Sequence, residues 1–134
     1  MKRVAIFASE LLPYSETFIR EQARALRRWH PVLVGRRLAP KGLSLDGLEV
    51  RLLTGGLASP LQRLCCAFCS WAGWSNPLIV AALRRQGCEL VHAHFGVNAI
   101  DVWPAARKLG IPMLVSLHGY DITIERSWWE AGHG

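Results

Sequence analysis

Two short apolar runs, each ending in histidine, flank a segment of helical length in the second half of the chain. The runs are Glu89–His94 and Met113–His118, and the segment Gly96–Leu109 between them is followed by Gly110-Ile111-Pro112. Continuous aliphatic runs are typical of strands buried on both faces of a parallel sheet, while glycine and proline end a helix. We therefore expect a strand–helix–strand unit that places a histidine at the carboxyl end of each strand, where ligands bind in open α/β sheets.

Three further strands are expected upstream, over residues 3–8, 31–34 and 49–53. A helix is expected over residues 15–29 and a longer helical segment over 57–86. Because strands and helices alternate along the chain, we expect an α/β fold, a doubly wound parallel sheet with right-handed crossovers and strand order 3-2-1-4-5. The length of 134 residues fits a single domain.

The loop after the first strand, residues 9–14, leads polar residues into the first turn of the expected helix. Ser15 is suited to cap this helix, and Glu16 complements its positive end. Together with Thr17 they bring hydroxyls and a carboxylate to a helix N-terminus, where free backbone N–H groups can hold an anion or sugar hydroxyls. The buried face of this helix is expected to consist of Ile19, Ala23, Leu26 and Trp29.

The segment 57–86 contains an uncharged stretch between Arg63 and Arg84 that is long enough to cross a bilayer. Ser75-Asn76-Pro77 interrupts it, and a connection between two strands of one sheet has to lie on that sheet. We therefore expect two helices packed against the sheet. The alternative is a surface role, in which tryptophans and arginines seat the segment on an anionic membrane; the residues concerned are Trp71, Trp74, Arg63, Arg84 and Arg85.

Composition restricts the partners. Sixteen Lys and Arg against ten Asp and Glu give a net charge of +6, which suits phosphorylated small molecules, anionic lipid or nucleic acid. Aromatic residues are not interleaved with the basic ones, so no nucleic-acid partner is expected. No G-x-G-x-x-G follows the first strand and no P-loop lysine is present, so no cofactor is expected. The N-terminal apolar run is too short for a signal peptide, which indicates a cytoplasmic protein.

Histidines and cysteines raise the question of a metal. His92 and His94 alternate along the fourth strand and are expected on one face, where a zinc site would need a third ligand, and none is obvious in the sequence. The alternatives are a ligand-contacting role for His94 and satisfied core histidines. Cys66 and Cys69 have C-x-x-C spacing, but their apolar neighbours indicate packing rather than redox or zinc chemistry.

His118 is followed by Gly119-Tyr120-Asp121 at the end of the fifth strand. Gly119 permits a sharp turn or a close approach of a ligand to the backbone. His118 can act as a hydrogen-bond donor or proton carrier, with Asp121 orienting it or binding a hydroxyl. The alternative is that His118 ends the strand and Asp121 caps the next turn.

Three segments together resemble the N-terminal domain of family 4 glycosyltransferases, in the bacterial branch that builds exopolysaccharides such as colanic acid or amylovoran. These segments are Ser15-Glu16-Thr17-Phe18-Ile19, Val91-His92-Ala93-His94-Phe95-Gly96, and Gly110-Ile111-Pro112 through Leu117-His118-Gly119-Tyr120-Asp121. The resemblance runs from Val4 to about Glu130. Each motif is moderately specific alone, and their order and spacing add specificity.

The resemblance implies a Rossmann-like domain, the acceptor-binding half of a two-domain GT-B enzyme. It implies retaining, metal-independent transfer from a nucleotide-diphosphate sugar to a saccharide or lipid-linked acceptor, at the inner face of the cell membrane for a lipid-linked one. Ser15, Glu16 and Thr17 would line the acceptor side, His94 would shape the floor, and His118 would approach the transferred sugar and the leaving phosphate. Gly119 and Asp121 would belong to the substrate-binding residues.

The chain also departs from the family pattern. The paired glutamates of the donor signature, separated by seven residues, are absent, and the first loop lacks the paired glycines of many relatives. By the resemblance, residues 1–134 form an incomplete acceptor-side domain that is inactive without a donor-binding C-terminal domain. Two alternatives remain: a non-catalytic interaction module that uses Trp128 and Trp129, and a zinc-dependent hydrolase built on His92, His94 and His118.

Overall fold

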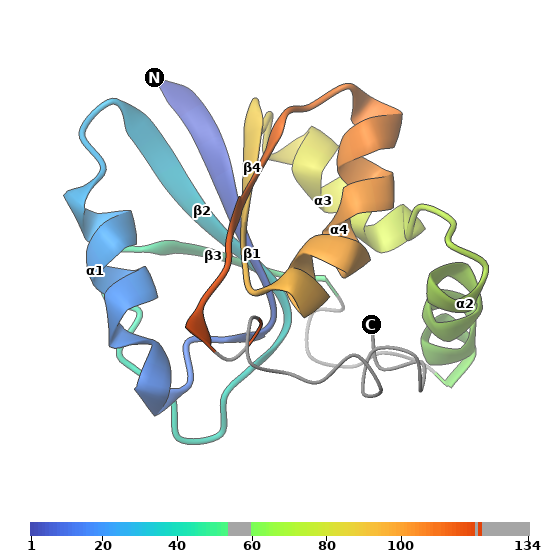
Figure 1. Ribbon diagram of the computed structural model, residues 1–134, viewed down its shortest axis with the longest axis horizontal. Helices are drawn as coiled ribbons and strands as arrows, with labels where there is room; N and C mark the ends of the chain where they lie inside the picture. The colour runs from blue at the N-terminus through green and yellow to red at the C-terminus, as the bar shows by residue number, and fades with distance from the viewer. Residues whose placement is uncertain (54–59, 120, 122–134) are drawn as a thin grey trace.

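Five parallel strands form a single sheet in the order β3-β2-β1-β4-β5 (Figure 1). The computed structural model describes residues 1–53, 60–119 and 121. The strands are β1 (Lys2–Leu11), β2 (Trp29–Leu38), β3 (Glu49–Leu52), β4 (Leu90–His94) and β5 (Met113–Ser116). The helices are η1 (Tyr14–Glu16), α1 (Thr17–Ala25), α2 (Pro60–Trp71), α3 (Pro77–Arg85) and α4 (Gly96–Leu109). The expected α/β fold and strand order are confirmed, and the fold is Rossmann-like.

Helices cover both faces of the sheet, α1 on one side and α3 with α4 on the other (Figure 1). Side chains alternate along β1, so that Ala5 and Phe7 join the core under α3 and α4 while Ile6 and Ala8 join the core under α1. This two-sided burial explains why the central strands are continuous apolar runs rather than alternating ones.

The first two strands are longer than expected, and the predicted loop over residues 9–14 is wrong in its first half. β1 continues to Leu11 because the ladder with β2 continues, pairing Glu10 with Arg37 and Leu11 with Leu38. The side chain of Arg37 donates to Glu10 Oε2 at 2.6 Å, and Leu11 is buried. Pairing and burial therefore extend the strand past the polar residues that suggested a loop.

Helix α1 is shorter than the expected helix over residues 15–29. It ends at Ala25, Leu26 is already extended, and Trp29 opens β2 opposite Lys2 instead of continuing the helix face. Ile19 and Ala23 are buried as expected. The residue before the helix is Glu16, and it makes no side-chain capping hydrogen bond, so the expected Ser15 cap is wrong; the turn η1 precedes the helix instead.

The break in the long helical segment lies where Asn76-Pro77 predicted it. Asn76 Oδ1 accepts the backbone N–H of Leu78 at 2.9 Å and caps α3, with Pro77 at the first helical position. α3 packs on the sheet through Ile79 and Leu83, as expected. In the part of the chain that the structure describes, no helix is long and apolar enough to span a membrane.

Helix α2 contradicts the expectation that the whole segment packs against the sheet. Its apolar side chains Leu61, Leu64, Phe68 and Trp71 are exposed, because they lie on a face of the helix that turns away from the molecule. The cysteines are all free; Cys69 and Cys88 are buried as expected of packing residues, while Cys65 is exposed. Helix α3 alone therefore supplies the packing that was expected of both helices.

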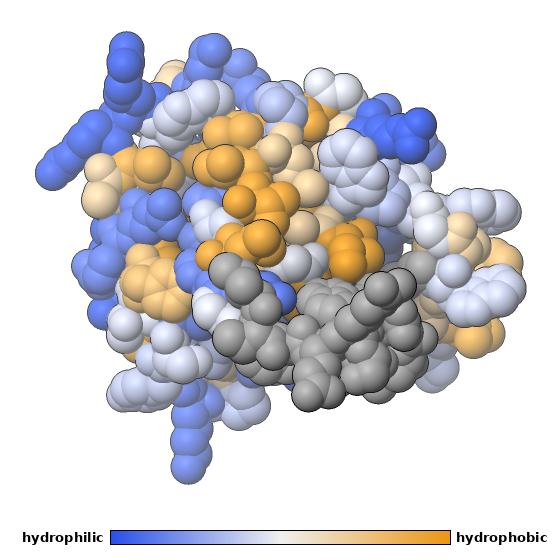
Figure 2. All heavy atoms as spheres, viewed as in Figure 1, coloured by the Kyte–Doolittle hydropathy of each residue, from blue (hydrophilic) through white to orange (hydrophobic). Residues whose placement is uncertain are grey.

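The strand–helix–strand unit of β4, α4 and β5 closely follows the sequence. β4 and α4 have the expected bounds, and Gly110 ends α4 in the left-handed conformation at φ 66°. β5 stops at Ser116, two residues before the expected end at His118. β5 is the last strand in the order, so Leu114 on it and Leu117 directly after it are exposed, and Figure 2 shows hydrophobic residues gathered there.

Candidate functional site at the carboxyl ends of the strands

Two histidines of β4 lie on the same face of the strand, as the alternation predicted. The ring centroids of His92 and His94 are 4.2 Å apart, and both side chains are buried. His92 Nε2 lies 2.8 Å from Ser116 Oγ of β5, so its partner comes from the neighbouring strand. β4 thus carries a pair of imidazoles toward the edge at which its carboxyl end lies.

The structure brings His94 and His118 together. His94 Nδ1 lies 3.2 Å from His118 Nε2, and the two rings are stacked with centroids 5.4 Å apart. The contact follows from sheet register, because His94 pairs with Ser116 at the end of β5 and His118 follows two residues later. Strands β4 and β5 therefore bring two of the predicted site residues into direct contact.

Asp121 holds the segment after β5 against α4. Its Oδ1 accepts the N–H of Gly96, the first residue of α4, and its Oδ2 accepts the N–H of His118, both at 2.9 Å. The N–H of Asp121 in turn donates to the carbonyl of His118, and Gly119 lies exposed in the turn so formed. This carboxylate therefore caps the start of α4 and holds the backbone of His118.

Two phenylalanines that the sequence analysis did not assign to the site surround His118. The Phe18 ring of α1 is 4.7 Å from the His118 ring, and the Phe95 ring is 4.6 Å from it. Phe95 has a φ of 70°, a conformation that costs energy for a bulky residue and turns the chain sharply from β4 into α4. Two features of Phe18 could have indicated a role at the site. It belongs to the Ser-Glu-Thr-Phe segment, and it lies at an exposed rather than a buried position of its helix.

A buried amide joins the ends of the two central strands. Asn98 Nδ2 donates to the His94 carbonyl at 2.8 Å, and its Oδ1 accepts the N–H of Ser9 at 3.1 Å. Ser9 Oγ also contacts Asp101, whose other oxygen accepts from Arg36 at 2.6 Å. This network spans β1, β2 and α4, so it fixes the strand ends at the point where the strand order reverses.

The first turn of α1 lies beside this rim through Phe18, which follows Thr17 directly. Ser15 and Thr17 are exposed, while Glu16 is partly buried and its Oε2 has no hydrogen-bond partner among the described residues. Burial, with a contribution from the nearby Glu10 carboxylate, raises the pKa of Glu16 to about 7. A carboxyl group with this pKa can donate or accept a proton near neutral pH.

Burial also lowers the pKa values of the two histidines of β4. Burial, together with the neighbouring rings of His92 and His118, lowers the pKa of His94 to about 4. Burial and His118 lower the pKa of His92 as well. His94 is therefore neutral at physiological pH, and its Nε2 is buried without a partner in the described part of the chain.

The histidine cluster does not have the geometry of a metal centre. The rings of His94 and His118 stack, His92 Nε2 faces Ser116 Oγ, and His94 Nδ1 faces His118 Nε2. Within residues 1–53, 60–119 and 121, no three His, Cys, Asp or Glu side chains are arranged to hold a metal ion. Trp128 and Trp129, on which the alternative of an interaction module depends, lie outside the described residues.

No family model and no curated protein matches the sequence. Two crystal structures of the C-terminal domain of a hydrogenase from Pyrococcus furiosus are similar in fold, with TM-scores of 0.51 and 0.52 and 16% identity. They cover 85% and 86% of this chain, and the chain covers 88% and 90% of them. MurG from Acinetobacter baumannii has a TM-score of 0.48 and 16% identity over 87% of this chain and 35% of MurG. At these identities the likeness shows the fold alone.

Proposed function

We propose that the chain is the acceptor-side domain of a GT-B glycosyltransferase of the family 4 type, over residues 1–134, whose donor-binding half is a separate domain. The observation that carries this proposal is the convergence of three motifs at one rim. Phe18 from the Ser-Glu-Thr-Phe segment packs on the ring of His118, and His118 contacts His94 of the His-Ala-His segment. Segments far apart in the sequence thus meet where an α/β sheet binds its ligands.

The proposed reaction transfers a sugar from a nucleotide-diphosphate sugar to a hydroxyl group of the acceptor. The acceptor oxygen forms a bond to the anomeric carbon, the bond from that carbon to the diphosphate breaks, and the diphosphate leaves with its electron pair. The acceptor proton passes to the departing diphosphate oxygen, and transfer proceeds with retention and without a metal. We assign His118 to donate a hydrogen bond to the charge that develops on the leaving phosphate.

The acceptor is held by polar groups around that point. Ser15, Glu16 and Thr17 are assigned to its hydroxyl groups, and His94 to the floor of the site. The unpartnered Oε2 of Glu16 supports this assignment, because a hydroxyl group would satisfy it. Gly119 admits the substrate close to the backbone. Asp121 holds the turn that carries His118 and Gly119. A saccharide or lipid-linked acceptor of exopolysaccharide synthesis fits these groups, and a lipid-linked one places the reaction at the inner face of the cell membrane.

The assignment of His118 is tested in the full-length protein by His118→Ala. Loss of one donor aimed at developing charge reduces transfer by roughly 10²–10³-fold, measured as labelled sugar moved from a nucleotide-diphosphate sugar to the acceptor. The fold is expected to persist, because His118 is only partly buried. The matched control is His30→Ala, which removes an imidazole from β2 and leaves transfer unchanged. Full transfer by His118→Ala, or stoichiometric zinc in the purified protein, would contradict the proposal.

A further inference from the structure

Helix α2 carries its apolar face outward. Leu61, Leu64, Phe68 and Trp71 recur at helical spacing on one side, and Leu61 and Trp71 are 76% and 84% exposed. Among the residues of this helix whose burial is described, Cys69 is the buried one, and it lies on another side. A helix that belongs only to a water-soluble surface turns its polar side outward, so this stripe needs an apolar partner.

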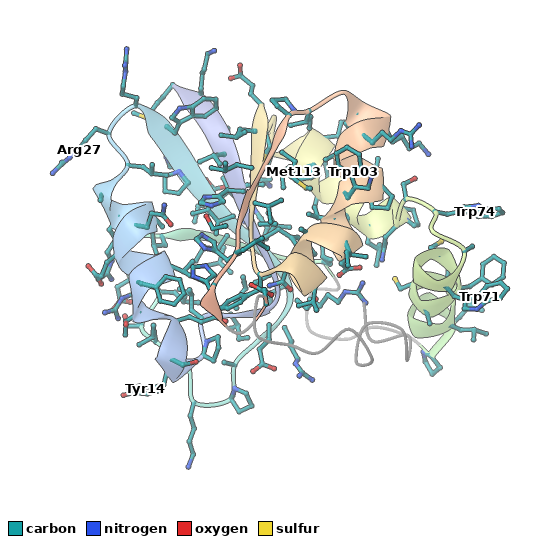
Figure 3. The ribbon with its side chains drawn as sticks, viewed as in Figure 1. Tyr14, Arg27, Trp71, Trp74, Trp103 and Met113 are labelled. Carbon is teal, nitrogen blue, oxygen red and sulfur yellow. The ribbon has the colours of Figure 1, made fainter. Side chains whose placement is uncertain are left out.

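Aromatic rings extend the stripe beyond the end of the helix. The Phe68 ring lies 6.0 Å from the Trp71 ring and 5.8 Å from the Trp74 ring. Trp71 and Trp74 lie at the outer edge of the molecule and point away from its body (Figure 3). Tryptophan is the side chain that prefers the level of lipid headgroups, with an apolar ring and one N–H donor.

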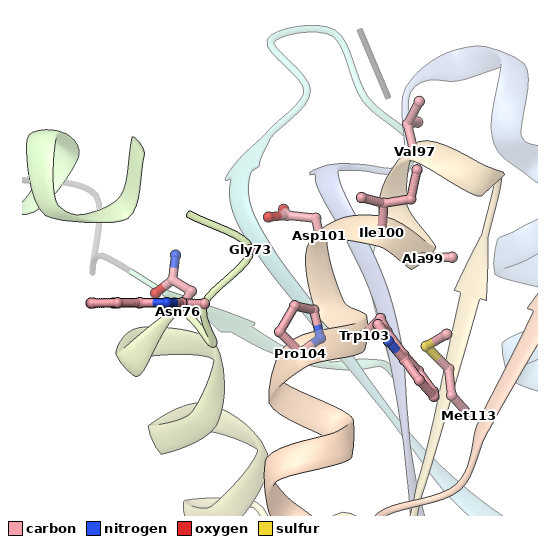
Figure 4. Close-up of a pocket in the computed structure, with 10 residues that line it drawn as sticks. Gly73, Asn76, Val97, Ala99, Ile100, Asp101, Trp103, Pro104 and Met113 are labelled. Carbon is pink, nitrogen blue, oxygen red and sulfur yellow. The ribbon is translucent and has the colours of Figure 1, made fainter. Parts of the chain in front are cut away.

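Basic residues adjoin the aromatic end of the stripe. A groove of about 610 Å³ runs between the turn at Gly73–Ser75 and α4, and Trp74, Trp103, Arg107 and Lys108 line it. A second hollow of about 530 Å³ continues it along α4 toward Met113, with Trp103 and Pro104 between them (Figure 4). Its one carboxylate, Asp101, already accepts from Arg36. The groove therefore presents two cations beside two indole rings.

We propose that the docking face, defined as Leu61, Leu64, Phe68, Trp71, Trp74, Arg107 and Lys108, seats this protein on an anionic lipid bilayer. The apolar stripe of α2 enters the boundary between headgroups and acyl chains, and the two cations meet lipid phosphates. This inference rests on the proposed function for its purpose, because a lipid-linked acceptor lies in such a bilayer. α2 also lies toward the end of the molecule where the strands have their carboxyl ends (Figure 1).

Charge distinguishes a bilayer from a second copy of the chain as the occupant. From Leu52 to Cys88 the sequence contains no Asp or Glu, and it contains Arg63, Arg84 and Arg85. Two copies joined through the docking face would place cations against cations without compensating carboxylates. An anionic membrane supplies the opposite charge over the whole area.

The apolar half is tested by Leu64→Gln, Phe68→Gln and Trp71→Gln combined in the full-length protein. Binding is measured by co-sedimentation with phosphatidylcholine vesicles that contain phosphatidylglycerol. The exposed positions leave the fold intact, checked by circular dichroism, and vesicle binding falls tenfold or more (roughly the loss of several buried apolar side chains). The control is Leu38→Gln on β2, an exposed apolar residue outside the docking face, which binds as the unaltered protein does.

The charged half is tested by Arg107→Gln with Lys108→Gln. Binding to anionic vesicles falls about fivefold per residue, and binding to pure phosphatidylcholine does not change. The control pair Arg27→Gln with Arg28→Gln removes equal charge from exposed residues, of which Arg27 lies on the far side from Trp71 (Figure 3), and it retains binding. An equal loss in both pairs would overturn the proposal, since net charge alone would then explain binding.

Two further outcomes decide the matter independently of sugar transfer. Absence of vesicle binding by the unaltered protein, or a dimer in light scattering that the triple variant abolishes, would overturn the docking face. The triple variant is expected to transfer sugar normally to a water-soluble acceptor. If the unaltered protein binds vesicles normally but transfers no sugar, the proposed function is contradicted and the docking face is not.

Discussion

At the scale of single residues, the candidate site contains two titratable groups whose pKa values burial shifts in opposite directions. His94 is kept neutral by burial and by neighbouring rings, and Glu16 is kept protonated up to about pH 7. Each shift links folding stability to pH, because the unfolded chain exchanges protons at ordinary pKa values. The two effects have opposite signs and can be separated by substitution.

The pKa of His94, about 4, predicts a loss of stability in mild acid. Between pH 6.5 and pH 4 the unfolded chain binds a proton at this position and the folded chain does not, so the free energy of unfolding falls as pH falls. The expected loss is on the order of 3 kcal/mol at most. It is measured by urea denaturation across this range. His94→Gln should flatten the dependence and His30→Gln should retain it; a His94 ring that titrates near 6.5 in NMR spectra would contradict this account.

Glu16 has the opposite dependence. Between pH 4.5 and about 7 the folded chain retains a proton that the unfolded chain releases, so the free energy of unfolding falls as pH rises through this window. Glu16→Gln removes the effect, and above pH 7 it should raise the free energy of unfolding by about 1–3 kcal/mol. Glu21→Gln, an exposed residue of the following helix α1, serves as the control. An unchanged stability of Glu16→Gln at pH 8 would show that the carboxylate is not buried as described.

The residues of the site differ in how far the sequence could reveal them. His94 and His118 follow strand-like runs, so the general rule for strand ends located both. Phe18 and Asn98 could not be found this way, because their roles depend on which helix face meets which strand end. Glu16 was recognised as polar at a helix start, but its raised pKa depends on burial and on Glu10, which only coordinates show.

At the scale of elements, Asn98 is the link between β1, β4 and α4. Asn98→Leu keeps the size of the side chain but leaves the Ser9 N–H and the His94 carbonyl without this partner. The expected cost is about 2–4 kcal/mol of unfolding free energy, measured by urea denaturation. Ser9→Ala, which loses only the longer contact to Asp101, should cost less than about 1 kcal/mol. Equal stabilities for Asn98→Leu and the unaltered protein would mean that the strand ends do not depend on this amide.

Element boundaries show where local sequence signals fail. β4 and α4 have the expected bounds because apolar run, glycine and proline all agree there. β1 and α1 differ from expectation because tertiary pairing decides their ends: Glu10 and Leu11 continue a ladder, and Trp29 begins one. Helix α2 differs from the expectation because its apolar stripe is equally compatible with packing on the sheet and with exposure at the surface.

At the scale of the whole molecule, two surfaces with different chemistry lie on one fold. The rim at the strand ends gathers imidazoles, a protonatable carboxyl group and aromatic rings, and the docking face gathers exposed apolar and cationic side chains. The strand order places residues 92–95 beside residues 118, 119 and 121 at that rim, and Phe18 packs on His118 there. This order was predictable from the alternation of strands and helices. The direction in which α2 faces was not.

We propose that the rim around His94 and His118 binds the substrates of sugar transfer. The most direct measurement is a titration of the full-length protein with a nucleotide-diphosphate sugar and a saccharide acceptor, followed by NMR of the histidine ring signals. We expect the His118 and His94 signals to shift until the ligands saturate the site, while those of His30 on β2 stay in place. Binding that moves His30, or that leaves His118 and His94 unmoved, would contradict it.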